Sequence, residues 1–433
     1  MTLLRKAILW TVLIILFEAS VRKYILASPV LVLLKYIALV PLFVYAFKGP
    51  SARYSIALFA ITLPLLATIP EPAFIPYAVY DLISIFYLPV ILFCLSIARR
   101  IFPFQAARDL LRLIALIGFL NSILIILQSL VGPQHWLSQT VDQSFSIHAF
   151  GEALKAPGLA GTSSPYMSIA GLIALDVLLR APISRREKRL IPFSQLLIAI
   201  SVVFNLASRT YTFGILGYVL PRLLIPSLIN KRFEKSALIF LLLPLAYYFF
   251  QSVAPELGLS IFKANRAVDD FSSASGRFYT IPLLSLLLIN PFALPFVDGL
   301  GLGYAVNNNP LADISYTPHF CMVIGLGSEH EYERFICSFG AIGFLHILSR
   351  LVLAVISIRN ALYYSNPRFP ASIASGWLFF TLTLANGLLL RSNDTATGAL
   401  LLLITLSASQ SLLASREDER MHHAHHELSF PAT

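Results

Sequence analysis

Long apolar segments alternate with short polar stretches along almost the whole chain. A helix that crosses a bilayer needs about 20 mostly apolar residues, and only helices and closed barrels satisfy their backbone groups in lipid. The pattern therefore predicts an all-α polytopic membrane protein with about twelve transmembrane helices, built as a single integral membrane domain over residues 1–433. The candidate segments are 6–21, 29–47, 54–70, 74–97, 111–131, 162–180, 190–208, 210–229, 236–253, 333–357, 371–390 and 395–415.

The loops between these segments carry unequal numbers of basic residues. When the N-terminus is placed in the cytoplasm, the inner loops and tails hold twenty Lys and Arg residues, and the outer loops hold nine. Cytoplasmic loops of membrane proteins carry the excess of positive charge. The bias predicts that both termini lie in the cytoplasm.

Two of the predicted outer loops are long, 132–161 and 254–332, and the second lies between the ninth and tenth helices. The loop 254–332 contains an apolar stretch, Arg277 to Phe292, that is too short and too closely bounded by proline for a span. We expect a helix there that lies along the outer membrane interface. The histidine-rich tail, 416–433, is expected to be a disordered cytoplasmic end.

Composition supports a membrane protein and argues against several soluble classes. Hydrophobic residues make up 57% of the chain and charged residues 12%, whereas soluble domains carry roughly 25% charged residues. The net charge of +10 is explained by basic cytoplasmic loops, so no nucleic-acid partner is expected. Cys94, Cys321 and Cys337 do not have the spacing of a metal or redox site, and we expect no metal and no cofactor.

Four arginines lie at predicted outer helix ends, against the charge rule. They are Arg209, Arg277, Arg334 and Arg391. Each one alone is explained by anchoring of a helix end at the lipid headgroups. Together they indicate an anion site, because a guanidinium group matches phosphate oxygens and keeps its charge at any working pH.

A cluster of charge, Glu329 to Arg334, precedes the tenth apolar segment. Acidic residues favour the first turn of a helix, and this explains Glu331 and Glu333. It explains Glu329 and His330 less well, because both precede the expected helix. A carboxylate or imidazole beside an anion site could instead remove a proton from an incoming hydroxyl group. His319 is a further candidate for that role.

Two pairs of ionisable residues fall inside predicted spans at helical spacing. Glu18 and Arg22 are four residues apart and are expected to pair along one helix face. His346 and Arg350 are also four apart. Arg350 lies near the inner end of its span, so we expect its side chain to extend to the membrane surface.

Several segments resemble the bacterial O-antigen ligase and polymerase superfamily. "FEASVRKYIL" (17–26) is similar to an E-x-x-x-R-K-aromatic opening, "KAPGLAGTSSPYMSIAGL" (155–172) to a G-x-x-x-x-x-x-P stretch, and "NLASRTYTFGIL" (205–216) to a serine-arginine signature. "SGRFYTIPLLSLLLINPF" (275–292), followed by "GLGLGY", resembles an arginine-led segment with a glycine turn. "EHEYERFICSFGAIG" (329–343) is similar to E-x-E-x-x-R-x-x-x-E-x-G-x-x-G.

The resemblance implies a metal-independent glycosyltransferase in the bacterial inner membrane, with its active site facing the periplasm. Its donor would be a glycan on a polyprenyl diphosphate, and its acceptor a hydroxyl group of a glycan or lipid. Arg209, Arg277 and Arg334 would bind the diphosphate, with Glu329 or His330 as the base. Arg391, Glu331 and His319 would support this site.

The chain departs from the family pattern at two places. Ser338 stands where the motif has its last acid, and Glu329 with His330 stands where ligases have a histidine-asparagine pair. The identity of the base, the choice between ligase and polymerase, and the activity of this member stay open. The alternative function is a transporter or flippase of lipid-linked sugars or other anions. Matched halves and charged or broken helices near the membrane midplane would favour it.

Overall fold

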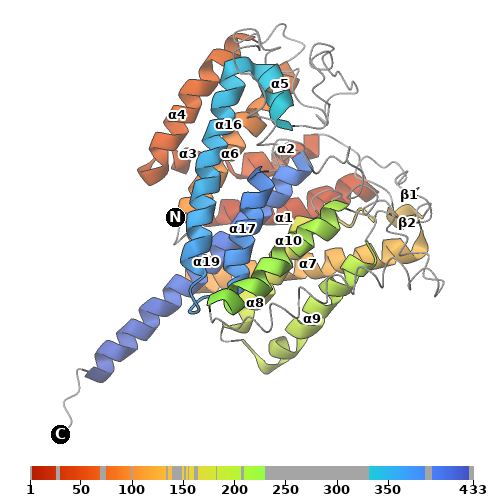
Figure 1. Ribbon diagram of the computed structural model, residues 1–433, viewed down its shortest axis with the longest axis vertical. Coiled ribbons are helices and arrows are strands. Elements are labelled where there is room, and N and C mark those ends of the chain that lie inside the picture. Colours follow the sequence, from red (N-terminus) through yellow and green to blue (C-terminus); the bar gives the residue numbers. More distant parts are fainter. Residues whose placement is uncertain are drawn as a thin grey trace.

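The computed structural model describes residues 2–25, 30–68, 75–98, 101–132, 135–138, 149–150, 153–154, 156–159, 164–181, 183–205, 209–229, 331–385 and 393–428. These residues are almost entirely helical (Figure 1). The one exception within this part of the chain is a short antiparallel pair, β1 (Ala149–Phe150) and β2 (Ala153–Leu154), with Ala149 opposite Leu154.

The helices up to residue 131 are mostly short pieces of predicted spans. They are α1 (Thr2–Tyr24), α2 (Val30–Ala38), α3 (Val40–Ala46), the 3-10 helix η1 (Gly49–Ser51), α4 (Ala52–Thr62), the 3-10 helix η2 (Leu63–Thr68), α5 (Ile75–Leu82), the π-helix η4 (Ile83–Tyr87), α6 (Leu88–Ile97) and α7 (Phe104–Val131). Proline explains two of the breaks, because it lies at the first or second position of both α3 and α6 and cannot donate a backbone hydrogen bond.

The helices after residue 135 begin with the short 3-10 helix η5 (Trp136–Ser138). The α-helices that follow are α8 (Ser164–Leu179), α9 (Arg185–Val203), α10 (Arg209–Ile229), α16 (Glu331–Tyr364), α17 (Ala371–Ala385) and α19 (Asn393–Leu428). Every predicted span except 236–253, which lies outside the described residues, falls on these helices. The stretch expected along the outer interface, Arg277 to Phe292, also lies outside them.

Four described helical segments are long and apolar enough to cross a membrane. They are Gly49–Ala67, Phe104–Val131, Ala341–Tyr364 and Thr397–Ser415. Shorter apolar helices accompany them at Ile83–Ile97, Ser164–Leu179 and Ala371–Leu384. The chain is therefore a helical membrane protein, while the total of twelve spans and the position of the long external loop stay predictions.

Helices α7, α8 and α19 form the centre of the bundle. Almost every described side chain of α8 is buried, and 89% of the most apolar window of Thr397–Ser415 is buried, against 28% for Gly49–Ala67. Glycine permits a close contact between α7 and α8: a Cβ atom added to Gly118 of α7 would lie 2.8 Å from the Cα atom of Gly171 of α8. Small residues let helix backbones approach in this way where no hydrophobic effect operates between them.

Hydrogen bonds join the loops at one end of this bundle. Arg5 Nε donates to the Ile101 carbonyl at 3.0 Å, and Arg180 Nη1 donates to the Arg368 carbonyl at 3.4 Å. Arg112 of α7 forms an ion pair with Glu187 at 2.6 Å. We call this the Glu187 end. All of these residues belong to loops or helix ends that the charge bias assigns to one side of the membrane.

One expectation about the C-terminus needs correction. The segment 416–433 was expected to be disordered, but α19 continues as helix to Leu428. The sequence "REDERMHHAHHEL" contains three Glu, two Arg and one each of Met, Ala and Leu, all strong helix formers, so the helix extends beyond the apolar segment. Residues 429–433 lie outside the described part.

Candidate functional site

Three of the predicted site residues lie at the described starts of helices, where the structure describes their backbone. Arg209 is the first residue of α10. Glu331 begins α16, and Arg334 lies in its first turn. The remaining predicted site residues, Arg277, His319, Glu329, His330 and Arg391, lie outside the described residues.

A loop near the start of α10 is held by two amide side chains of α7. Gln128 Oε1 accepts the N–H group of Gly158 at 2.8 Å, and its Nε2 donates to the Leu137 carbonyl at 2.8 Å. Asn121 Oδ1 accepts the N–H group of Leu159 at 2.9 Å. Amide side chains carry both donors and acceptors, so they can replace the backbone partners that the loop lacks.

Asn205, next to the end of α9, holds the same loop from the other side. Its Oδ1 accepts the N–H group of Ala156 at 3.0 Å, and its Nδ2 donates to the Ala156 carbonyl at 3.1 Å. The side chain thus satisfies both backbone groups of one residue. The four-residue loop 156–159 is consequently fixed by hydrogen bonds from α7 and from Asn205.

Gly158 is required by this arrangement. Its φ angle is +60°, in the left-handed region that side chains disfavour. A Cβ atom there would collide with the side chains of Ser164 and Asn121. Ser164 in turn donates from Oγ to the Pro157 carbonyl at 2.6 Å, so the loop leads directly into α8.

Tyr211 connects this loop region to Arg209. Its hydroxyl group lies 2.8 Å from Ser168 Oγ of α8 and 2.8 Å from Ser201 Oγ of α9. Asn121 Nδ2 also donates to Ser168 Oγ at 3.1 Å. Because Tyr211 follows Arg209 by two residues, this buried network fixes the first turn of α10, in which Arg209 is the first residue.

The end of α1 reaches the same region. Tyr24 donates from its hydroxyl to the Leu137 carbonyl at 3.2 Å, the carbonyl that Gln128 also contacts. The rings of Tyr24 and Trp136 meet edge to face with centroids 5.5 Å apart. We call this the Gly158 end of the bundle.

The expected pair of Glu18 and Arg22 is present, and a third charge joins it. Glu18 Oε1 contacts Arg22 Nη1 at 3.0 Å, and Glu18 Oε2 contacts Lys35 Nζ of α2 at 3.0 Å. The side chains of Glu18 and Lys35 are 5% and 1% exposed. One buried carboxylate therefore binds two cations from different helices.

The expectation for Arg350 is wrong. Its side chain is buried instead of extending to the surface, and its Nη2 donates to the Ser84 carbonyl in η4 at 3.0 Å. The cause lies in the π-helix. Leu88 donates its N–H group to Ile83, and Pro89, the next candidate donor for Ser84, has no N–H group. The guanidinium group supplies the hydrogen bond that the helix cannot.

His346, one turn before Arg350, is also buried, and its Nε2 atom lies 3.4 Å from Thr62 Oγ1.

A further charged cluster joins α10 to α8 and α9. Arg222 Nη2 contacts Asp176 Oδ1 of α8 at 2.7 Å, and Gln195 Nε2 of α9 contacts the same oxygen atom at 2.6 Å. These contacts join different helices, and charged groups inside membrane-spanning segments are normally paired.

Sequence reasoning did not single out Asn121, Gln128, Asn205 or Tyr211. A signal was present, since polar amides inside segments as apolar as α7 are unusual. Which backbone groups they satisfy became visible only in the fold. Among the described residues, no three His, Cys, Asp or Glu side chains are grouped as metal ligands would be.

Comparison with protein-family models, with curated proteins and with solved structures finds no match to this chain.

Proposed function

We propose that the protein is a glycosyltransferase of the O-antigen ligase or polymerase type. It transfers a glycan from a polyprenyl diphosphate to a sugar hydroxyl group at the outer face of the bacterial inner membrane, in the assembly of surface polysaccharide. The main support is that three segments resembling this family, far apart in sequence, meet at the Gly158 end.

The convergence rests on a continuous set of hydrogen bonds. Tyr24 belongs to the first segment (17–26), Gly158 to the second (155–172) and Asn205 to the third (205–216). Tyr24 and Gln128 share the Leu137 carbonyl, Gln128 holds Gly158, and Asn205 holds Ala156. Arg209 starts α10 beside this junction, which suits a role in anion binding.

In the proposed reaction, the acceptor oxygen attacks the anomeric carbon and the bond from that carbon to the diphosphate oxygen breaks. Negative charge grows on the leaving diphosphate, and Arg209, Arg277 and Arg334 stabilise it. The proton of the acceptor hydroxyl group passes to Glu329 or His330. The apolar helices provide a surface for the polyprenyl chain.

The experiment measures glycan transfer from a polyprenyl-diphosphate donor by purified protein, with donor binding measured separately. Replacing Arg209, Arg277 or Arg334 by alanine is expected to lower transfer about a hundredfold. Lysine should rescue only part of the loss, because it keeps the charge without the two-pronged geometry. Arg359→Ala, at an exposed position far along α16, is the matched control.

The base is identified by a second pair of variants. If Glu329 accepts the proton, Glu329→Gln lowers transfer with little change in donor binding, and His330→Ala does not. The opposite pattern assigns the base to His330. Near-normal transfer by all three arginine-to-alanine variants would reduce these residues to headgroup anchors.

A transporter or flippase of lipid-linked sugars is the second candidate. The buried charges of Glu18, Lys35 and Asp176 favour it, because ionisable residues inside spans often mark a transport route. Movement of a lipid-linked sugar across protein-containing vesicles, in the absence of transfer to an acceptor, would support this candidate over the enzyme.

A further inference from the structure

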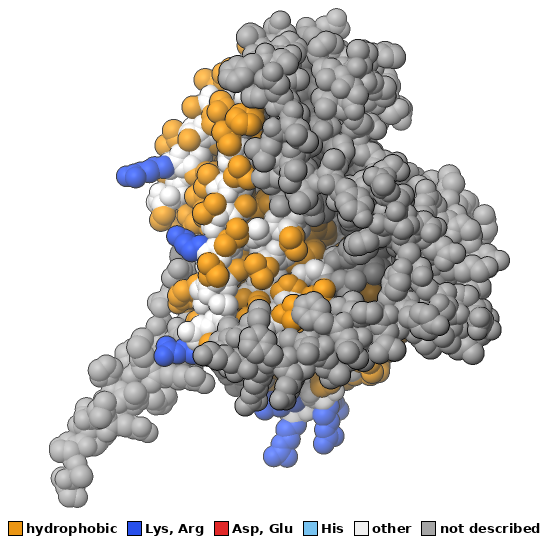
Figure 2. All heavy atoms as spheres, viewed as in Figure 1, with side chains coloured by type: hydrophobic (Ala, Val, Ile, Leu, Met, Phe, Trp, Pro, Cys, Tyr) orange, Lys and Arg blue, Asp and Glu red, His pale blue; other side chains and the backbone are white. Residues whose placement is uncertain are grey.

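The N-terminal turns of α9 carry a dense group of exposed cations. Arg185, Arg186, Lys188 and Arg189 are all exposed. Figure 2 shows Lys and Arg side chains projecting from the lower edge of the molecule, where Figure 1 places the beginning of α9. Arg180 and Arg368 are exposed at the same end and are joined by a hydrogen bond.

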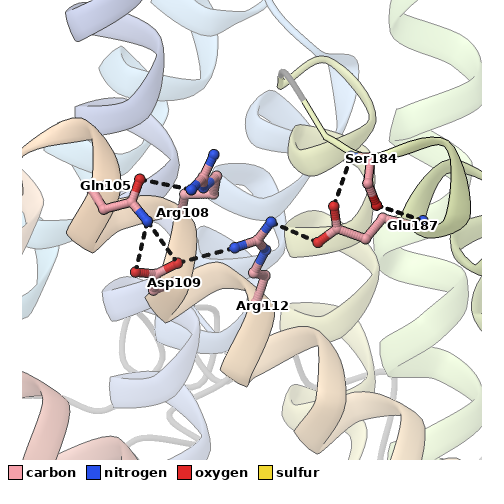
Figure 3. Close-up of polar contacts among 6 residues, drawn as sticks. All are labelled: Gln105, Arg108, Asp109, Arg112, Ser184 and Glu187. Atoms are coloured by element: carbon pink, nitrogen blue, oxygen red, sulfur yellow. Dashed lines mark hydrogen bonds and ion pairs between the residues drawn. The ribbon is translucent and has the colours of Figure 1, made fainter.

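The one acidic residue in this run is directed elsewhere. Glu187 forms a capping box with Ser184, accepting its backbone N–H group at 2.8 Å and donating its own to Ser184 Oγ at 3.2 Å. Its Oε1 pairs with Arg112 of α7 at 2.6 Å. Figure 3 shows this contact continuing through Arg112 to Asp109 and Gln105.

These contacts keep Glu187 ionised while turning it toward α7. The backbone N–H group of Ser184 and, secondarily, Arg112 hold the pKa of the Glu187 carboxyl group below its ordinary value. Among the described residues, no carboxylate lies within ion-pair distance of Arg186 or Arg189. Their charges therefore remain available to an outside anion.

An exposed apolar stripe continues from these two arginines along the same helix face. Residues three and four apart are neighbours on a helix, and this spacing relates Arg186 to Arg189 and Leu190, and Leu190 to Phe193. We define the α9 stripe as Leu190, Phe193, Leu196 and Ile200, with exposed fractions of 55%, 56%, 58% and 38%. In a membrane protein, a helix face of this kind contacts acyl chains.

We propose that Arg186 and Arg189 bind the headgroup phosphate of an anionic membrane phospholipid whose acyl chains lie along the α9 stripe. Two exposed cations beside an apolar stripe on the same helix face match both parts of such a lipid. Charge complementarity favours an anionic headgroup over a zwitterionic one, because the latter carries a compensating cation. The proposal is independent of the glycosyltransferase function.

The test measures binding of fluorescent phosphatidylglycerol to the purified full-length protein in uncharged detergent. Wild-type protein is expected to bind it, with displacement by unlabelled phosphatidylglycerol but not by phosphatidylcholine or inorganic phosphate. The double substitution Arg186→Gln and Arg189→Gln should weaken binding about thirtyfold. Raising the salt concentration should weaken wild-type binding, because exposed charges are screened.

Two controls test whether a loss of binding comes from this site. One excludes a general effect of removing positive charge, and the other excludes misfolding of the variant. Arg359→Gln removes an exposed cation at the end of α16, beside its own apolar residues, and should leave binding unchanged. Replacing Arg186 and Arg189 by lysine keeps both charges and should retain most of the binding. Equal displacement by phosphatidylcholine, or unchanged binding by the double glutamine variant, would overturn the proposal. Displacement by inorganic phosphate would instead indicate a site for free phosphate.

Discussion

At the scale of single residues, Glu18 is a buried carboxylate that pairs with two cations. Its two oxygen atoms contact Arg22 and Lys35, and Lys35 is almost fully buried on a different helix. Removing charges from water is costly, and their mutual attraction offsets this cost only when the geometry is good. Glu18 therefore ties α1 to α2 through charge as well as through packing.

We predict that Glu18→Gln destabilises the protein markedly. The amide keeps the shape of the side chain but leaves Arg22 and Lys35 facing a neutral group. Removing one partner of a buried ion pair typically costs about 3–5 kcal/mol. The measurement is the thermal unfolding midpoint in detergent.

A second variant isolates the charge effect. The double variant Glu18→Gln with Lys35→Met removes the buried cation as well, and it should recover part of the lost stability. The Lys35→Met single variant is measured for comparison. The idea fails if Glu18→Gln unfolds at the wild-type temperature, or if Lys35→Met lowers the unfolding midpoint as much in the Glu18→Gln background as it does alone.

At the scale of elements, the π-helix η4 explains why an arginine is buried in α16. Pro89 cannot donate a hydrogen bond, and Leu88 donates to Ile83. The Ser84 carbonyl instead accepts a hydrogen bond from the Arg350 side chain. π-Helices are rare and concentrate at functional positions, and here the irregular turn joins the α5–α6 region to α16.

We predict energetic coupling between Pro89 and Arg350. Arg350→Met leaves the Ser84 carbonyl without this donor, and a buried unsatisfied polar group costs about 1–3 kcal/mol. In a Pro89→Ala background, the new N–H group can take over that carbonyl. The cost of Arg350→Met should then be smaller, and unfolding of the four proteins of this cycle measures the difference. Equal costs in both backgrounds would show that Arg350 acts through other contacts.

At the scale of the whole molecule, the connections sort into two ends. At the Glu187 end, four contacts join separate elements: Arg5 of α1 with Ile101, Phe102 with Ser411 of α19, Arg112 of α7 with Glu187 of α9, and Arg180 with Arg368 before α17. Tyr24, Leu137, Gly158 and Asn205 meet at the Gly158 end. The charge bias assigns the residues of the Glu187 end to the cytoplasm and those of the Gly158 end to the outside, and this orientation stays a prediction.

We predict that the Gly158 end faces the outside of the cell. His135→Cys and Ser184→Cys report on the two ends, in a protein whose native Cys94, Cys321 and Cys337 have been replaced. An impermeant thiol reagent should label the cysteine at 135 in intact cells, and the one at 184 only after the cells are opened. The reverse pattern would invert the orientation and move the Gly158 end to the cytoplasm.

Much of the helical framework could be predicted from the apolar pattern, because lipid requires backbone groups to be paired within a helix. The pairing of Glu18 with Arg22 followed from their spacing of four residues. The burial of Arg350 could not be predicted from its place near the end of an apolar segment. It depends on the Ser84 carbonyl, which is 266 residues away in sequence.

The sequence by itself determined that this is a helical membrane protein, where its apolar segments lie and which loops carry the positive charge. These properties are local, since hydropathy and helical spacing act over about 20 residues. Only the tertiary structure decided that Asn121, Gln128 and Asn205 hold one loop, that Lys35 joins Glu18, and that Glu187 turns toward α7. The physical reason is that a buried polar group must find a hydrogen-bonding partner wherever the fold places one, and that partner is set by packing of distant helices.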